Sequence, residues 1–244
     1  MRKIIGLTLL SLAVLGACSK KDPVLPGDRV AIFPGTTLTY SKSEITNLPD
    51  TAFTPNARDC PYRQDASNVI WHGDKKIFSG FATSNSVIGN QKPVCDGNSV
   101  YAGLTTGELV RVNTKTRNIE WIADIYRASN MTGGAAVLDI IAPIIINGND
   151  IYVGGLGDAY CKINKSNGNK KWCVGVGVGV PFVITDRVSF VLGTNNTLYA
   201  INNVDGSIYW NVTDIRTQRA PVYNNGIISV GSQKFNATTG KTIK

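Results

Sequence analysis

Residues 199–210 have the sequence YAINNVDGSIYW, the clearest copy of a pattern that recurs along the chain. A run of β-prone residues precedes Asn202, and a turn that contains Gly206 leads into a second run that ends at Trp210. β-Branched and aromatic residues on both sides of an Asn, Asp and Gly turn are typical of a β-hairpin. The stretch therefore predicts two antiparallel strands joined by a tight turn.

The same pattern recurs along the chain with nearly constant spacing. In each complete copy an aromatic residue at position i is followed by Asn at i+12 and by Trp at i+20, and a Pro stands at i−8 or i−9. A fourth copy begins in the same way, and the sequence stops at the position of its Trp. The repeat positions are Pro93, Tyr101, Asn113 and Trp121 in the first copy; Pro143, Tyr152, Asn164, Gly168 and Trp172 in the second; Pro181, Phe190, Asn202, Gly206 and Trp210 in the third; and Pro221, Asn236 and Gly240 in the fourth.

Each copy has the composition of four short strands. Turn residues separate the β-prone runs, and the Pro stands at the start of the first run, where it removes no central hydrogen bond. A four-stranded sheet that repeats at intervals of about 38–50 residues is the pattern of a β-propeller blade. We therefore expect an all-β fold, a β-propeller of about four to five four-stranded antiparallel blades, with an incomplete ring as one outcome. The repeated Trp should pack between neighbouring blades.

One tryptophan lies outside these copies. Residues 68–71, NVIW, resemble the strand that carries Trp in the other copies, and the interval from Trp71 to Pro93 equals the interval from Trp121 to Pro143. We expect Trp71 to belong to an outer strand supplied to the C-terminal blade, because that pairing would remove an exposed sheet edge. The alternative is that Trp71 lies in an unrelated loop.

The N-terminus has the features of an export signal. A short cationic start precedes an uncharged, mostly apolar run from Ile4 to Ala17, which is shorter than the roughly 20 residues that cross a membrane. It ends in Leu15-Gly16-Ala17-Cys18, which resembles the lipobox of bacterial lipoproteins. The resemblance implies cleavage before Cys18 and acylation of its thiol by palmitate-like chains that anchor it in a membrane. The alternative is an ordinary cleavage site with an incidental Cys.

These features divide the chain into three parts. We expect a signal peptide over residues 1–17, a lipidated N-terminus with an extended tether over 18–66, and the propeller repeats over 67–244. Ser19 follows the acylated position. By the sorting rule of bacterial lipoproteins, a residue other than Asp at this place favours the outer membrane over the inner membrane.

Four further cysteines permit three pairings, and an exported chain meets an oxidising compartment. A turn near Gly168 places Cys161 opposite Cys173 on adjacent strands, where Cβ atoms lie about 4.5–5.5 Å apart. This geometry favours Cys161–Cys173 first. Cys60–Cys95 is expected as a second pair, and the other pairings stay open. Paired C-x-x-C spacing, typical of a zinc site, is absent from the sequence.

The composition excludes several classes of protein. Hydrophobic residues make up 43% and charged residues 17%, so the chain does not resemble a disordered one. With 25 Gly, 2 Met and 1 His, a helical bundle is disfavoured. The formal net charge of +8 is spread along the chain without a basic run. A solvated cationic surface is therefore favoured over a nucleic-acid or anionic-lipid site.

The spacing Asn-x-x-x-Gly-x-x-x-Trp after Tyr-Ala-Ile resembles the repeat of PQQ-like β-propellers. Together with the lipobox and the Pro-rich segment from Pro23 to Gly27, it makes the chain similar to the BamB family of outer-membrane assembly lipoproteins. The resemblance implies a lipid-anchored periplasmic scaffold, without a cofactor, that contacts outer-membrane barrel-assembly proteins. Members of that family carry about eight blades. This shortened chain would be a reduced ring, a half-ring that pairs with another chain, or a degenerate remnant without function.

The pattern does not indicate catalysis. PQQ-binding dehydrogenases of this fold resemble one another in an adjacent Cys pair and a calcium-binding carboxylate cluster, whereas no two Cys are adjacent in this sequence and its acidic residues fall mainly at expected turns. His72 is the only His, without an evident nucleophile beside it. We expect no enzyme activity, metal or cofactor. A propeller that binds a small ligand or a redox group is the alternative.

Overall fold

The computed structural model describes residues 38–54, 60–83, 92–126 and 137–243. The expected signal peptide and the lipidation site Cys18 lie outside the described residues. The described part consists of strands, turns and extended segments, and no helix in it is long and apolar enough to cross a membrane.

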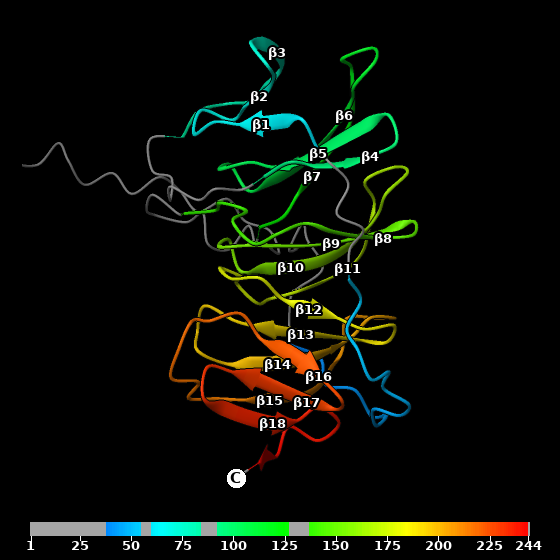
Figure 1. Cartoon of the computed structure of the whole chain (residues 1–244), viewed down its shortest axis with the longest axis vertical. Coiled ribbons are helices and arrows are strands. Elements are labelled where there is room, and N and C mark those ends of the chain that lie inside the picture. Colours follow the sequence, from blue (N-terminus) through cyan, green and yellow to red (C-terminus); the bar gives the residue numbers. More distant parts are fainter. Residues whose placement is uncertain (1–37, 55–59, 84–91, 127–136, 244) are drawn as a thin grey trace, which may run out of the picture. The chain divides into compact units, whose positions relative to one another are not determined.

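Five antiparallel sheets follow one another along the chain, and Figure 1 labels their strands from β1 to β18. We number them blades 1 to 5 in chain order. Neighbouring strands in each blade are consecutive in the sequence, so each blade is a meander. The prediction of an all-β, incomplete propeller is confirmed, although blade 1 has three strands where the other blades have four. The strands are β1 (Tyr62–Gln64), β2 (Val69–His72) and β3 (Lys75–Ser79) in blade 1; β4 (Val94–Asp96), β5 (Ser99–Gly103), β6 (Glu108–Asn113) and β7 (Ile119–Asp124) in blade 2; β8 (Ile145–Asn147), β9 (Asp150–Gly155), β10 (Ala159–Asn164) and β11 (Lys170–Val174) in blade 3; β12 (Val183–Ile184), β13 (Val188–Leu192), β14 (Leu198–Asn202) and β15 (Ile208–Val212) in blade 4; and β16 (Val222–Asn224), β17 (Ile227–Val230), β18 (Gln233–Asn236) and β19 (Thr242–Ile243) in blade 5.

Successive blades pack against each other through hydrophobic clusters that take side chains from both partners. Between blades 2 and 3, for example, Tyr101 and Leu109 share a cluster with Ile151 and Ile163. Because an inner blade is covered on both faces, every residue of β5 and of β13 is buried. This is why these strands lack the polar and apolar alternation of a half-exposed sheet.

The register of blade 1 corrects the expectation for Trp71. In blades 2, 3 and 4 the pairing of the last two strands slips at one place, and the repeated Trp lies opposite the residue just before the slip. In blade 1 the slip falls between Ile70 and Trp71, and the residue opposite Ile70 is Phe78. Phe78 is 8% exposed and holds the position of the repeated Trp, while Trp71 lies on the preceding strand.

The outer strand of blade 5 is β19, which pairs with β18. Trp71 pairs instead with Arg63 and Lys76 inside blade 1. The prediction that Trp71 closes the C-terminal blade is therefore wrong. The physical reason is that a strand next in the sequence closes a short loop at a lower entropy cost than a distant segment does. The Trp71 indole donates to Asp65 at 2.7 Å, and the Arg63 guanidinium lies 5.0 Å from its ring centroid.

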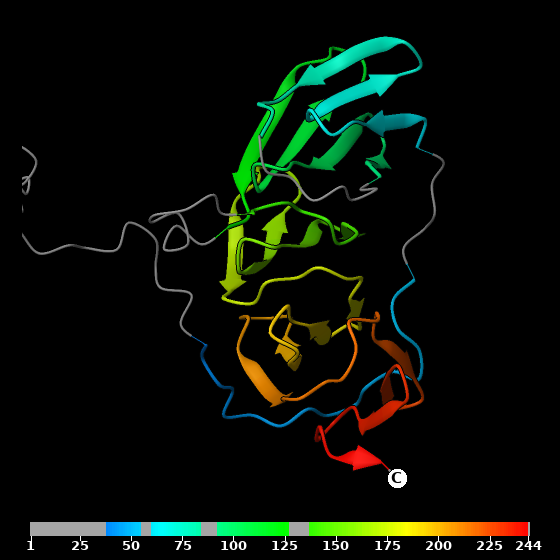
Figure 2. The ribbon, with the colours of Figure 1, turned by 90° about the vertical axis from the view of Figure 1, so that its left-hand side faces the viewer.

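Residues 38–54, expected within the tether, lie against blades 4 and 5, and we call them the strap. The strap is blue in Figure 2. It begins as an added strand on the outer edge of β15, in a parallel bridge between Tyr40 and Ile208. The N–H of Ile208 donates to the Thr39 oxygen at 2.7 Å, and the N–H of Ser41 donates to the Ile208 oxygen at 2.8 Å.

The far end of the strap reaches the first strands of the same two blades. The N–H of Phe53 donates to the Ile184 oxygen of blade 4 at 2.8 Å, and the N–H of Asn225 in blade 5 donates to the Asp50 oxygen at 2.8 Å. Between these anchor points the Ile45 side chain is buried in the cluster shared by blades 4 and 5. The expected boundary between tether and propeller at residue 66 is thus corrected, because the strap and β1 both belong to the folded part.

The disulfide in blade 3 joins directly opposed residues. Cys161 on β10 and Cys173 on β11 are register partners, with an S–S distance of 2.06 Å and a Cα–Cα distance of 4.1 Å. The bond closes the hairpin whose turn contains Gly168, and it therefore stays within one blade.

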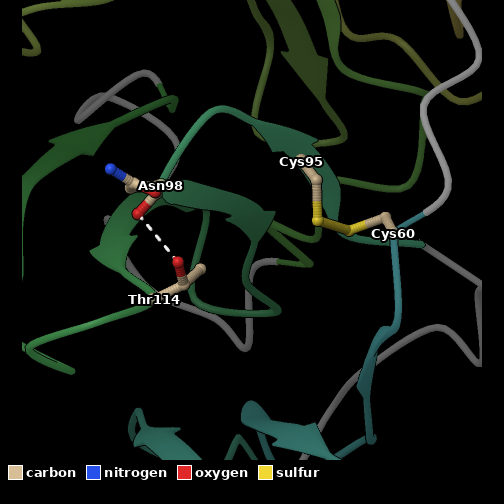
Figure 3. Close-up of a disulfide and its surroundings, with 4 residues drawn as sticks. All are labelled: Cys60, Cys95, Asn98 and Thr114. Carbon is tan, nitrogen blue, oxygen red and sulfur yellow. Dashed lines mark hydrogen bonds between the residues drawn. A yellow bond between two sulfur atoms is a disulfide. The ribbon is translucent and has the colours of Figure 1, made fainter.

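The second disulfide joins two blades. Cys60, just before β1, is bonded to Cys95 on β4, with a Cα–Cα distance of 5.2 Å (Figure 3). The same view shows the Thr114 hydroxyl donating to the main-chain oxygen of Asn98 at 3.0 Å, which ties two turns of blade 2 together. Blade 1 is thus covalently attached to blade 2.

We predict that Ile45→Ala lowers the free energy of unfolding by about 2–4 kcal/mol, because the side chain is 5% exposed and its removal leaves a cavity. Urea denaturation followed by circular dichroism measures this loss. Lys42→Ala, on the exposed side of the strap, should change it by less than about 0.5 kcal/mol. Equal, negligible losses for both variants would contradict the packing of the strap.

Candidate protein-binding edge and the interblade junctions

One tryptophan holds each junction between blades 2 and 3, 3 and 4, and 4 and 5. Its indole Nε1–H donates to the carbonyl oxygen of the residue that follows the repeated Asn in the next blade. A large ring and a hydrogen bond shielded at least in part from water therefore act at the same place. The pairs are Trp121–Lys165 at 3.0 Å, Trp172–Asn203 at 3.2 Å and Trp210–Ala237 at 3.0 Å.

A glycine of the next blade lies over each of these rings. An added Cβ would come within 2.8 Å of the ring at Gly168, 2.9 Å at Gly206 and 2.8 Å at Gly240. The three residues also have φ values of 75°, 77° and 70°, in the left-handed region that side chains disfavour. Close approach and backbone conformation both require glycine here.

The repeated Asn shapes the turn that carries this glycine. The Asn202 side-chain oxygen accepts from the N–H of Val204 at 2.9 Å, and its main-chain oxygen accepts from the N–H of Gly206 at 2.9 Å. These local bonds place the carbonyl that the indole reaches. Equivalent bonds surround Asn113, Asn164 and Asn236.

At the junction between blades 1 and 2, both the glycine of the turn and the tryptophan that would lie beneath it are replaced. Arg117, with φ 61°, stands where the later turns have glycine. Blade 1 offers Phe78 where later blades offer Trp. The three glycines thus go with the three junction tryptophans.

A cation supports the tryptophan at the junction of blades 2 and 3. Arg111 Nη1 donates at 2.9 Å to the Lys165 oxygen, the same atom that Trp121 reaches. Its guanidinium lies 5.7 Å from the Tyr101 ring centroid, and its Nε is 2.6 Å from the Glu120 carboxylate. The positive charge is neutralised within its own blade.

Lys162 has the same role at the next junction. Its Nζ donates to the Asn203 oxygen at 2.9 Å, lies 5.5 Å from the Tyr152 ring centroid and is 2.9 Å from Asp150, which also pairs with Lys171. Burial opposes ionisation of Asp150, but the hydrogen bonds from Lys171 and Lys162 outweigh it and hold the pKa of this carboxyl below its usual value. Burial, with a contribution from the charge of Asp150, raises the pKa of Tyr152 well above the usual value, so the phenol stays neutral.

Sequence reasoning found the Trp, Asn and Gly positions but missed Phe78 and the two cations. The two cations could have been found from the sequence, because Arg111 and Lys162 each stand two positions before a repeated Asn. Phe78 could not, since the turn before it is shorter than in the other blades and lacks the Asn.

Other chemistry at the described residues is sparse. They include no group of three His, Cys, Asp or Glu side chains able to hold a metal ion. His72 stacks on Tyr62 with ring centroids 4.9 Å apart. A half-open hollow of about 230 Å³ beneath the strap is lined by Glu44, Ile45 and Trp210 among others, and is smaller than the roughly 300–1,000 Å³ of most ligand sites.

Exposed apolar side chains mark the outermost strand of blade 2. Ile119 and Ile122 on β7 are 50% and 47% exposed. We call residues 119–124 the β7 edge. An exposed sheet edge with large apolar side chains is the kind of surface to which another chain can add a strand, so the β7 edge is the candidate protein-binding surface.

The family model described as Outer membrane protein assembly factor BamB matches residues 57–212 and, in a second overlapping match, residues 162–243. The chain belongs to this family. The BamB of Yersinia pestis is 24% identical over 211 residues, which are 83% of this chain and 50% of that protein. The chain thus spans about half the length of the curated BamB relative that it matches.

Two solved structures are similar to the chain. BamB from Moraxella catarrhalis superposes with a TM-score of 0.48 at 15% identity, covering 83% of this chain and 66% of that one. A quinohemoprotein alcohol dehydrogenase from Pseudomonas putida HK5 superposes with a TM-score of 0.52 at 12% identity, covering 75% of this chain and 40% of that one. At this identity the likeness to the dehydrogenase shows the fold alone, and function depends on the site.

We predict that Gly206→Ala destabilises the protein more than Gly226→Ala does. Both glycines have similar φ values, 77° and 75°, but a Cβ would meet Trp172 only at Gly206 and nothing within 4 Å at Gly226. Both variants share the left-handed cost of about 1–2 kcal/mol, and Gly206→Ala should lose about 1–3 kcal/mol more from overpacking. Thermal and urea denaturation measure the difference, and equal losses would show that the ring does not constrain the turn.

We predict that the stabilisation by Asp150 is lost in acid. Its folded pKa is below the unfolded value of about 3.9, so its contribution is complete above that pH and disappears as the pH falls through the folded pKa. The difference in unfolding free energy between the wild type and Asp150→Asn should therefore be larger at pH 7 than at pH 3. Asp186→Asn, at an exposed turn, is the control. A gap that does not depend on pH would contradict the ion pairs.

Proposed function

We propose that this chain is a lipid-anchored, non-enzymatic scaffold that assists the assembly of β-barrel proteins in the outer membrane from the periplasmic side. The observation that carries the proposal is the match of the BamB family model across the blades. Its partners would be outer-membrane barrel-assembly proteins, met through protein–protein contacts without nucleic acid or cofactor.

The junctions suit a scaffold because they hold the blades in fixed relation. Trp121, Trp172 and Trp210 each fasten two blades. The charged groups beside them are engaged in ion pairs and in contacts with main-chain oxygens, as Arg111 and Lys162 are. Rigid elements of this kind present edges and turns to a partner at little entropic cost.

Cys18 is the proposed anchor, and the outer membrane is its proposed location because Ser19 follows it. Each buried methylene of an acyl chain contributes about 0.8 kcal/mol, so more than one chain gives stable anchoring. The segment from Cys18 to the start of the strap at Leu38 spans at most roughly 65–70 Å when fully extended. The start of the strap at Leu38 would therefore stay within that distance of the membrane surface.

We predict that tagged protein, extracted with detergent from membranes of the native host at its natural level, recovers the core of the barrel-assembly machinery. Immunoblotting of the eluate measures recovery. In Cys18→Ala, palmitate labelling should be lost and the protein should leave the membrane fraction, because the acyl chains are absent. A wild-type protein that stays in the membrane but recovers no core component would overturn the scaffold proposal.

A further inference from the structure

The outer edges of the blades can be compared position by position through the register slip. The residue just after the slip faces Lys76 in blade 1, Ile119 in blade 2, Lys170 in blade 3 and Ile208 in blade 4. These four residues therefore stand at equivalent places on the last strand of their blades. Blade 5 ends in β19, which is only two residues long.

The edge of blade 4 shows how this surface is covered. The strap adds to it in parallel, and both the N–H and the oxygen of Ile208 are used in main-chain hydrogen bonds to the strap. The Tyr40 hydroxyl donates at 3.2 Å to the side chain of Asn211, which lies further along β15. With the strap in place, Ile208 is 0% exposed.

The edges of blades 1 and 3 are protected in another way. Their outer strands carry the pairs Lys75–Lys76 and Lys170–Lys171, all exposed. Lysine on an edge strand disfavours the addition of a further strand, because the ammonium groups would have to be desolvated.

The β7 edge of blade 2 has neither kind of protection among the described residues. Ile119 holds the position of Ile208 but is 50% exposed, and Ile122 holds the position of Asn211 and is 47% exposed. At six residues, β7 is also the longest of the outer strands. The β7 edge is therefore equivalent to the β15 edge that binds the strap, but no segment among the described residues pairs with it.

We propose that the β7 edge binds an extended segment of an unfolded outer-membrane barrel protein, which adds in parallel at Ile119 as the strap adds at Ile208. The identity of this occupant rests on the proposed function. Strands of such barrels alternate apolar and polar residues, and the strap segment Leu38-Thr39-Tyr40-Ser41 has the same alternation. Apolar side chains of the segment would cover Ile119 and Ile122, and its main chain would pair with that of β7.

The test in cells uses the full-length anchored protein with a photo-cross-linking residue in place of Ile122, and the matched control carries it in place of Lys170. We expect cross-links to unfolded barrel proteins, identified by mass spectrometry, at position 122 and not at position 170. Ile119→Lys copies the lysine of blades 1 and 3 and should lower the yield by about tenfold. Val204→Lys, at a turn residue that is 78% exposed, should leave it unchanged.

A second measurement keeps the result independent of expression in cells. The purified protein is titrated with a fluorescent peptide that has the sequence TTLTYSKSE of residues 36–44. When the peptide is bound, we expect amide hydrogen exchange to slow at residues 119–124. The Ile119→Lys variant should bind the peptide about tenfold more weakly, while its thermal unfolding stays unchanged.

Several outcomes would overturn the proposal. These are cross-links at position 122 to a second copy of this chain, equal cross-linking at position 170, unchanged binding by Ile119→Lys, or slowed exchange at residues 208–212 in place of 119–124. Recovery of the barrel-assembly core by Ile119→Lys at the wild-type level would leave the scaffold function standing if the edge proposal failed. If the wild-type protein itself failed to recover the barrel-assembly core, the scaffold proposal would be contradicted instead.

Discussion

The structure depends on an indole ring packed beneath a turn that has no Cβ at the contact point. Trp121, Trp172 and Trp210 each donate a hydrogen bond to the next blade and lie against its glycine. The indole ring requires a glycine at the contact and a main-chain carbonyl oxygen within reach of its N–H. Because the repeated Asn forms the turn that positions both, it is required as well. Burial of both faces of the inner blades follows from this stacking, and strands such as β5 and β13 are buried along their whole length.

Blades 1 and 5 differ from the three blades between them in the contacts that attach them. Blade 1 replaces the Trp with Phe78 and is bonded to blade 2 through Cys60–Cys95. Blades 4 and 5 are joined by the strap in addition to the Trp210 junction. In blade 5 the paired residues Ser229 and Lys234 stand where blade 4 has Phe190 and Ala200. These two positions are therefore more polar in blade 5 than in blade 4.

The proposed scaffold role agrees with the way the sheet edges differ from one another. A scaffold needs rigid blades and a place where another chain can attach, and it needs its other edges to be inert. Lysines and the strap make three edges unattractive to a further strand, while β7 presents Ile119 and Ile122. The likeness to a quinohemoprotein dehydrogenase concerns the blades, which are a framework shared by proteins of different function.

The order of strands and turns, the four-stranded blades and the spacing of the Trp, Asn and Gly positions could all be predicted from the sequence. These are local features, since a hairpin turn and an alternating strand depend on residues close together in the chain. The sequence could not place Trp71 correctly, because Trp71 and Phe78 are distinguished only by a register slip that the spacing does not reveal. The docking of the strap and the exposure of the β7 edge were decided by tertiary structure alone. Whether Ile208 or Ile119 is covered depends on where a segment near the other end of the sequence comes to lie, and long-range contacts of that kind leave no periodic signal.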